Sequence, residues 1–164
     1  MSSEGAPISV LSSEFDPTGL SMAVIASRFN PDITDRLVAG AVDCFTRHGL
    51  NPESIEIIHV PGAWELPQAT SVVPRLARYD AIVTLGCVIR GETPHFDYVC
   101  SATNDGLAAL SREASTPQIF FGVLTADKHE QALARAQEGA NNKGYEAATA
   151  ALQMVDLYAR LTGN

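Results

Sequence analysis

The sequence predicts an α/β protein in which a parallel β-sheet lies between two layers of helices, a three-layer α/β/α sandwich. Two observations lead to this fold class. Short apolar runs alternate along the chain with longer segments in which apolar residues recur every three or four positions, and these patterns are typical of strands and of amphipathic helices. Most of the short runs are apolar at consecutive positions, as is usual for parallel strands that are covered on both faces.

Four short runs are expected to form the strands of this sheet. They are residues 22–26, 55–60, 81–85 and 119–124. A helical pattern lies between each strand and the next, and this alternation favours right-handed β-α-β connections and hence parallel pairing.

The helical segments carry recognisable start and stop residues. For the first helix, Asn30 suits the N-cap, Pro31 the first helical position and Gly49 the end. Its apolar face repeats every four residues, at Ile33, Leu37, Ala41 and Phe45. Two further helical patterns have their apolar residues between positions 66 and 76 and between positions 96 and 110, and the last two helices are expected at about 127–137 and 142–161.

Length and composition limit the classes of protein to consider. The chain has 164 residues, 46% of them hydrophobic, which suits one domain with a substantial core. We expect residues 1–19 to form an N-terminal arm and residues 20–164 to form a single domain. No apolar run is long enough to span a membrane and the arm lacks the pattern of a signal peptide, so a soluble, cytoplasmic protein is expected.

The charge of the chain and its cysteine and histidine residues argue against nucleic-acid binding, disulfides and a metal site. The net charge is −8, and Lys and Arg do not cluster, so nucleic acid is not an expected partner. The three cysteines, Cys44, Cys87 and Cys100, have apolar neighbours and are expected to be buried free thiols. No pair of histidines has the spacing of metal ligands, so no metal site is expected.

Aromatic, charged and glycine-rich segments follow the expected strands. The first three strands are followed by residues 27–30, 61–67 and 86–95, and the fourth runs through Phe120 and Phe121 into residues 122–125. Because ligands of open parallel sheets bind outside the carboxyl ends of the strands, these segments predict a ligand site at that edge. The fingerprints of nucleotide-binding loops and of GxSxG hydrolases do not occur in the sequence.

The segment that ends at His95 is the most informative of these. Thr93, Pro94 and His95 suit the N-cap and the first two positions of a helix. Backbone N–H groups near Glu92 and Thr93 would then point away from the helix and could bind a phosphate. Histidines commonly exchange protons near neutral pH, so His95 is a candidate proton-transfer residue; the alternative is a surface histidine at a helix start.

Three more side chains are candidates, each with a plainer alternative. Phe29 and Trp64 lie at the same edge of the sheet and could form a slot for a flat ring, or they could belong to the core. Glu65 could accept hydrogen bonds from a ligand, or it could serve as a carboxylate in the first turn of a helix. Arg135, judged from sequence alone, is a solvated surface arginine.

Five segments, in order, resemble lumazine synthases. They are SRFN at 27–30, VPGAWELP at 60–67, LGCVIRGETPHF at 85–96, FGVLT at 121–125 and, shortly after Arg135, NKG at 142–144. The resemblance spans about residues 20–160. It implies a flavodoxin-like sheet of four parallel strands, with an N-terminal arm that adds a strand to a neighbouring subunit's sheet. It also implies a homopentamer, which in many relatives assembles further into an icosahedral capsid of twelve pentamers.

The resemblance also implies roles for individual residues. His95 would transfer protons. Glu92 and Thr93 would bind the phosphate of a sugar-phosphate substrate together with Arg135, which would come from the neighbouring subunit. The pyrimidine substrate would be bound by Phe29, Ala63, Trp64, Glu65, Cys87, Val88, Ile89 and, from the neighbour, Phe121. Many relatives carry Ala or Gly in place of Glu92. Because a carboxylate repels phosphate, the Glu92 side chain is expected to turn away and to offer only the backbone N–H. Lys143 would add positive charge nearby.

The implied reaction is a condensation of 5-amino-6-(D-ribitylamino)uracil with 3,4-dihydroxy-2-butanone 4-phosphate, without a metal or redox cofactor. Small molecules and other copies of the chain are therefore the expected partners. Two alternatives remain at this point. One is a non-catalytic relative that binds a flavin or a lumazine. The other is a signalling domain of similar fold, although the acidic cluster expected after its first strand does not occur here.

Overall fold

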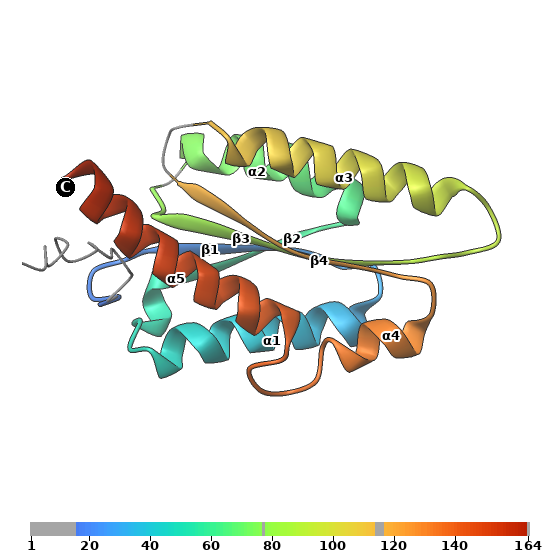
Figure 1. The fold of residues 1–164 in the computed structure, drawn as a ribbon, viewed down its shortest axis with the longest axis horizontal. Helices are drawn as coiled ribbons and strands as arrows, with labels where there is room; N and C mark the ends of the chain where they lie inside the picture. Colours follow the sequence, from blue (N-terminus) through green and yellow to red (C-terminus); the bar gives the residue numbers. More distant parts are fainter. Residues whose placement is uncertain (1–15, 77, 114–116, 164) are drawn as a thin grey trace, which may run out of the picture.

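The computed structural model describes residues 16–76, 78–113 and 117–163. Its centre is a four-stranded sheet with helices on both faces (Figure 1). The strands are β1 (Met22–Ser27), β2 (Ile55–Val60), β3 (Ala81–Ile89) and β4 (Gln118–Ala126). They lie in the order β2-β1-β3-β4 and are all parallel. The predicted three-layer fold and its flavodoxin-like sheet are therefore confirmed, whereas residues 1–15 of the predicted N-terminal arm lie outside the described part of the chain.

The helices divide between the two faces of the sheet. One face is covered by α1 (Pro31–Arg47), α4 (His129–Ala134) and α5 (Lys143–Thr162), and the other by α2 (Leu66–Leu76) and α3 (His95–Ser111) (Figure 1). Single 3-10 turns, η1 (Pro52–Ser54) and η2 (Ala63–Glu65), precede β2 and α2. None of the helices in these described ranges is long and apolar enough to cross a bilayer.

The two strands nearest one edge run further than the sequence predicts. Gly86 was assigned to a loop, but it continues β3, and the residues from Gly86 to Ile89 pair with Val123 to Ala126 of β4. A Cβ atom on Gly86 would lie 3.2 Å from both Leu66 and Ser27, so the glycine lets the strand pass close beneath the neighbouring segments. Residues 87–89 therefore stand on a rigid strand.

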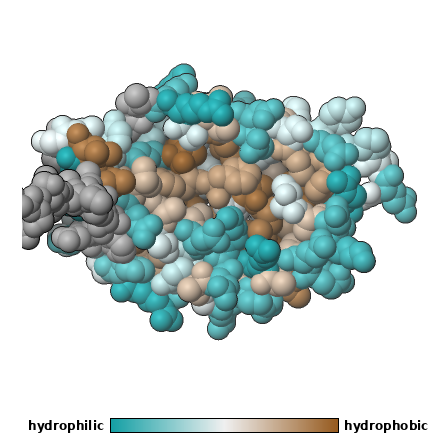
Figure 2. Space-filling model, viewed as in Figure 1, coloured by the Kyte–Doolittle hydropathy of each residue, from teal (hydrophilic) through white to brown (hydrophobic). Residues whose placement is uncertain are grey.

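The edge strand β4 leaves apolar surface exposed. Figure 2 shows hydrophobic residues along the middle of the face on which β4 lies, between α3 and α5. Phe121 of β4 is 42% exposed and Met154 of α5 is 41% exposed. Edge strands with exposed apolar residues tend to be covered by another chain.

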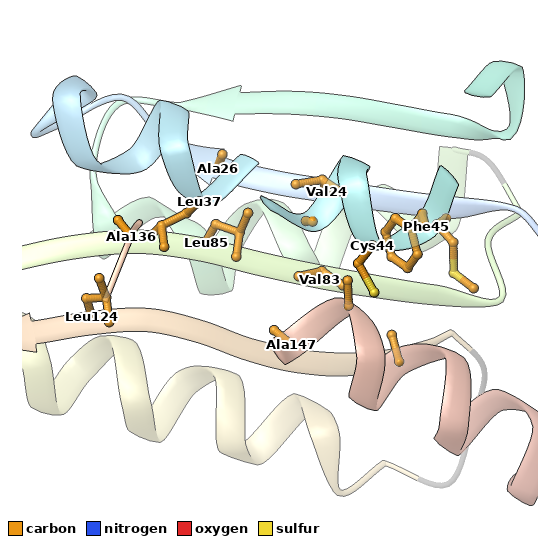
Figure 3. Packing of buried hydrophobic residues seen from close by; sticks show 14 of the residues in the cluster. Val24, Ala26, Leu37, Cys44, Phe45, Val83, Leu85, Leu124, Ala136 and Ala147 are labelled. Atoms are coloured by element: carbon orange, nitrogen blue, oxygen red, sulfur yellow. The ribbon is translucent and has the colours of Figure 1, made fainter. Parts of the chain in front are cut away.

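Two apolar clusters hold the layers together, one on each face of the sheet. Alternate residues of β1 serve the two clusters, which explains why the strand is apolar at nearly every position. On the α1 and α5 face, Val24 and Val83 pack with Leu37 and Phe45 (Figure 3). On the other face the cluster contains Ala23, Ile25, Leu66, Ile82 and Leu107. Cys44 and Cys87 are buried and Cys100 is half-buried, all as free thiols.

Helices α1 and α5 approach each other closely near the start of α5. A Cβ atom on Gly144 would lie 1.9 Å from the carbonyl oxygen of Leu37, and one on Gly40 would overlap Asn142. Asn142 caps α5 and also donates from Nδ2 to the carbonyl oxygen of Arg36 at 3.1 Å. The connection that follows α4 is thereby fixed against α1.

Candidate active site

A cavity of about 360 Å³ opens at the carboxyl edge of the sheet. It lies between the turn after β1, the η2 turn, the end of β3 and the first turns of α3. Its lining is mostly apolar and consists of Phe29, Gly62, Ala63, Trp64, Cys87, Val88, Ile89, Gly91, Thr93, His95, Phe96 and Val99. A concave, largely apolar pocket with a few polar groups at this edge is the usual form of a small-molecule site in such folds.

Two aromatic side chains at the cavity are unusually exposed. Phe29 is 69% exposed and Trp64 is 59% exposed. They come from different turns, after β1 and after β2, and meet the same cavity. Large aromatic rings left open to solvent at a pocket are suited to stacking on a flat ligand.

The turn that carries Phe29 is held by Asn30. Its backbone is left-handed, with φ 58°, a conformation that asparagine tolerates better than most residues. The sequence predicted that the Asn30 side chain caps α1, but it makes no capping hydrogen bond. Its Nδ2 instead donates to the carbonyl oxygen of Cys87 at 3.0 Å. Pro31 does begin the helix as predicted. Asn30 does occupy the N-cap position, but the predicted side-chain cap is wrong, because a capping residue is usually extended and the left-handed backbone of Asn30 is not. The bond from Nδ2 ties the Phe29 turn to β3.

Glu65 stabilises the η2 turn, to which it belongs. Its Oε2 accepts a hydrogen bond from the Gly62 N–H at 3.0 Å, and Thr103 of α3 donates to the carbonyl oxygen of Ala63 at 3.1 Å. These two bonds hold Ala63 and Trp64 at the cavity wall. Glu65 itself does not line the cavity. Its hydrogen bond to Gly62 is a local contact at the start of a helix, which is the alternative role that the sequence analysis gave for it.

His95 is the first residue of α3 and faces the cavity. The helix begins one residue later than predicted: Pro94 flanks it with φ −64°, and no side chain caps it. The predicted Thr93 cap was therefore wrong, because Pro94 already occupies the flanking position and its carbonyl oxygen accepts from the Asp97 N–H at 3.0 Å. Thr93 nevertheless lines the cavity beside His95.

The lining contains two titratable side chains, Cys87 and His95, and the Cys87 thiol is unreactive near neutral pH. Burial raises the pKa of its thiol to about 11, and the negative charge of Asp32 adds to the shift. The thiol is therefore neutral near pH 7, where it is a poor nucleophile. His95 is therefore the remaining candidate for proton transfer among the side chains of the lining.

The structure brings eight of the twelve predicted site residues to this cavity, and four lie outside it. Glu65 has been described, and Glu92 is exposed outside the lining. Phe121 lies in a shallow depression between β4 and α3. Arg135 lines a separate, more polar cavity of about 510 Å³. Phe96 lines both cavities, so the two cavities adjoin at this residue.

Sequence reasoning missed some of the lining. Phe96 and Val99 were assigned only to a helix, yet Val99 lies one helical turn after His95 and shares its face. That spacing could have identified it. Among the described residues, no group of three or more His, Cys, Asp or Glu side chains is placed to hold a metal ion. His129, the first residue of α4, pairs with Asp32 of α1.

This fold and this cavity define the class: an α/β protein with a candidate small-molecule site at the carboxyl edge of a parallel sheet. A model of the 6,7-dimethyl-8-ribityllumazine synthase family matches residues 19–159. The chain is 49% identical over 143 residues to the 6,7-dimethyl-8-ribityllumazine synthase of Aquifex aeolicus, an alignment that covers 87% of this chain and 92% of the relative. It is 48% identical over 144 residues to that of Chlorobaculum tepidum and 46% identical over 145 residues to that of Salinibacter ruber, with 88% of this chain and 92% of each relative covered. The chain belongs to the 6,7-dimethyl-8-ribityllumazine synthase family, whose members are transferases.

Proposed function

We propose that this chain condenses 5-amino-6-(D-ribitylamino)uracil with 3,4-dihydroxy-2-butanone 4-phosphate to give 6,7-dimethyl-8-ribityllumazine, with release of phosphate and water. This is the penultimate step of riboflavin biosynthesis. One observation carries the proposal: in a chain of this family, Phe29, Trp64 and His95 surround a single cavity. Two aromatic rings and one proton-transfer group are the requirements of a site that joins a flat heterocycle to a second substrate.

The pyrimidine fits the apolar end of the cavity. Phe29 and Trp64 supply ring surfaces, and the end of β3 supplies backbone. The ladder between β3 and β1 ends at Leu85, whereas β3 continues to Ile89. Backbone groups of residues 87–89 on that side can therefore pair with the polar edge of the uracil ring, much as another strand would.

Glu65 is proposed to bind the ribityl chain. A carboxylate accepts hydrogen bonds at both oxygens, so Glu65 can hold the Gly62 N–H through Oε2 and receive a ribityl hydroxyl as well. Ala63 and Trp64, in the same turn, would position the ribityl chain beside the ring.

The phosphate is proposed to lie near the start of α3. The first N–H groups of a helix lack partners within the helix and favour anions, and Thr93 adds a hydroxyl beside them. Glu92 would contribute its N–H, with the carboxylate turned outward; its side chain is exposed, which agrees with this orientation. Arg135 of a neighbouring subunit would supply the charge that binds phosphate most strongly, with Lys143 adding to the positive charge.

The chemistry then consists largely of positioning and proton transfer. An amine of the pyrimidine attacks the ketone, and water leaves as an imine forms. Phosphate is then eliminated, and the second nitrogen closes the ring with loss of another water. His95 would accept and return the protons that these steps move. Holding the two reactants together supplies a large part of the rate enhancement, so loss of the imidazole leaves substantial activity.

A homo-oligomer with sites between subunits is the proposed assembly, with a pentamer as its unit and an icosahedral capsid as its largest form. Support comes from Phe121 and Arg135, which lie outside the cavity of their own chain, and from the apolar surface along β4 (Figure 2). Phe121 would close the ring pocket of the adjacent subunit. Light scattering on the purified chain would give the size of the assembly; a stable monomer that forms product would contradict this arrangement. Location in the cytoplasm stays a prediction.

The test of the function is direct. The purified chain is mixed with both substrates, and the fluorescence of the lumazine product is followed. We expect product from the unaltered chain and a rate roughly 10–100-fold lower from His95→Ala, near the low end for general acid–base catalysis. His59→Ala, which removes an exposed histidine of β2, is the matched control and should keep the full rate.

Three outcomes would contradict the assignment. A folded chain that forms no product would remove the proposed reaction. Binding of added lumazine without its formation would favour the non-catalytic alternative. An unchanged rate in His95→Ala would remove the role of that residue.

A further inference from the structure

Arg90 follows β3 directly and joins three segments of the carboxyl edge. Its Nε donates to Oδ1 of Asp127 at 2.8 Å, and its Nη1 donates to Oδ1 of Asp97 at 3.3 Å. Its guanidinium carbon lies 4.3 Å from the centre of the Phe96 ring. Its own N–H donates to the carbonyl oxygen of Ala126 at 2.9 Å. One side chain thus contacts the first turn of α3 and the connection between β4 and α4 at the same time.

The segments that Arg90 joins carry the candidate site residues. Phe96 and Asp97 follow His95 in the first turn of α3. Asp127 opens the connection that leads through α4 to Arg135 and, with Arg135, lines the second cavity. The Phe96 ring, on which Arg90 stacks, lines both cavities. Arg90 therefore contacts Phe96, the residue shared by the cavity of His95 and the cavity of Arg135.

The first turn of α3 has few restraints of its own. No side chain caps the helix, and His95 and the four residues before it are exposed. Arg90 supplies restraints from outside the helix. A guanidinium group is suited to this because it is planar, can donate to two carboxylates at once and can stack on an aromatic ring. A lysine in its place could not make all three contacts together.

The contacts of Arg90 are of little use for the stability of the fold. All three charged side chains are substantially exposed, and exposed ion pairs contribute little to folding. The hydrogen bond to Asp127 and the charges of Asp97 and Asp127 nevertheless raise the pKa of Arg90 above its ordinary value, so the side chain remains charged. A charged group that adds little stability yet spans the site points to a role in geometry.

We propose that Arg90 is a positioning residue, which holds the first turn of α3 so that His95 faces the reacting atoms. The proposal rests on the proposed function. Arg90 does not line the cavity of His95, so it acts through Asp97, Phe96 and Asp127 and not through contact with the pyrimidine.

The test is a double-mutant cycle between Arg90→Ala and His95→Ala, measured by lumazine formation. We expect Arg90→Ala to lower kcat on the order of 10-fold, because small displacements of catalytic groups are costly, while KM for the pyrimidine stays within about twofold. If Arg90 acts through His95, the double variant will be no slower than His95→Ala alone. Arg90→Lys should recover only part of kcat.

A matched control is available on α1. Arg47 also holds a carboxylate, that of Asp43, through Nε at 2.8 Å on an exposed surface, and Arg47→Ala should keep the full kcat. The melting temperature of Arg90→Ala should fall by no more than about 4 °C. If this variant fails to fold, Asp97→Asn, which weakens one contact of Arg90 and keeps the side-chain shape, takes its place in the cycle.

The outcomes separate the two proposals. If the unaltered chain forms no product, the proposed function fails and the role of Arg90 fails with it. If the unaltered chain is active, a kcat of Arg90→Ala within twofold of its value overturns only the role of Arg90. The same conclusion follows if the kcat of the double variant falls by the product of the two single reductions, since Arg90 would then act independently of His95.

Discussion

Asn142→Ala is expected to destabilise the folded chain by about 2–3 kcal/mol, although the substitution removes only a small polar side chain. Asn142 is 1% exposed. Its Oδ1 accepts from the N–H groups of Gly144 at 2.8 Å and Tyr145 at 3.2 Å, and its Nδ2 donates to the carbonyl oxygen of Arg36 at 3.1 Å. One side chain thus caps α5 and joins it to α1.

The expected magnitude follows from these three bonds. Loss of an N-cap costs about 0.5–2 kcal/mol. The Gly144 N–H is buried, so loss of its partner places this site toward the upper part of that range. The hydrogen bond to Arg36 adds about 0.5–1.5 kcal/mol. For a chain of this length the sum corresponds to a fall in melting temperature of about 4–12 °C.

The assay is thermal or urea unfolding followed by circular dichroism, with the variants at equal chain concentration because assembly would make stability depend on concentration. Asn51→Ala is the matched control. Asn51 also caps a helix, but it is exposed and accepts one bond, from the Glu53 N–H at 3.1 Å, at a single 3-10 turn. It should cost less than about 1 kcal/mol. Equal losses in the two variants, or a loss below about 0.5 kcal/mol for Asn142→Ala, would refute the reasoning.

Two further predictions concern packing and alkaline pH. Gly144→Ala should destabilise the chain by about 3 kcal/mol or more, since its Cβ would lie 1.9 Å from the carbonyl oxygen of Leu37; Gly91→Ala, whose Cβ would meet nothing within 4 Å, should shift the unfolding midpoint little. The pKa of Cys87 rises from 9.0 to about 11 on folding, so the folded chain keeps a proton that the unfolded chain loses. The resulting stability is complete below pH 9 and declines by about 1–3 kcal/mol between pH 9 and 11. Urea unfolding across that range should show a smaller decline for Cys87→Ala, and identical pH slopes would contradict the shift.

Much of the fold can be read from the sequence because burial on both faces leaves a local signature. All six residues of Met22–Ser27 are buried, and five of them are apolar, so the strand is visible without knowledge of its partners. Pro31 and Gly49 mark the ends of α1 for equally local reasons: a fixed φ suits the first turn, and a positive φ suits the chain after the last one. The location of the site at the carboxyl edge follows from the parallel order of the strands.

The partners of individual side chains could not be predicted from local sequence patterns. Asn30 donates to Cys87, 57 residues away, and Arg90 to Asp127, 37 residues away; no local pattern distinguishes these acceptors from nearer ones. Gly86 continues a strand because it pairs with Val123 of β4, and the close approach of Leu66 and Ser27 favours a residue without a side chain there. A hydrogen-bonding group takes the partner that packing brings within about 3 Å, and that choice depends on how distant segments meet. The layers, the approximate strands and the edge that carries the candidate site can therefore be predicted from local sequence patterns, whereas the packing of the turns on one another sets which side chains line that edge.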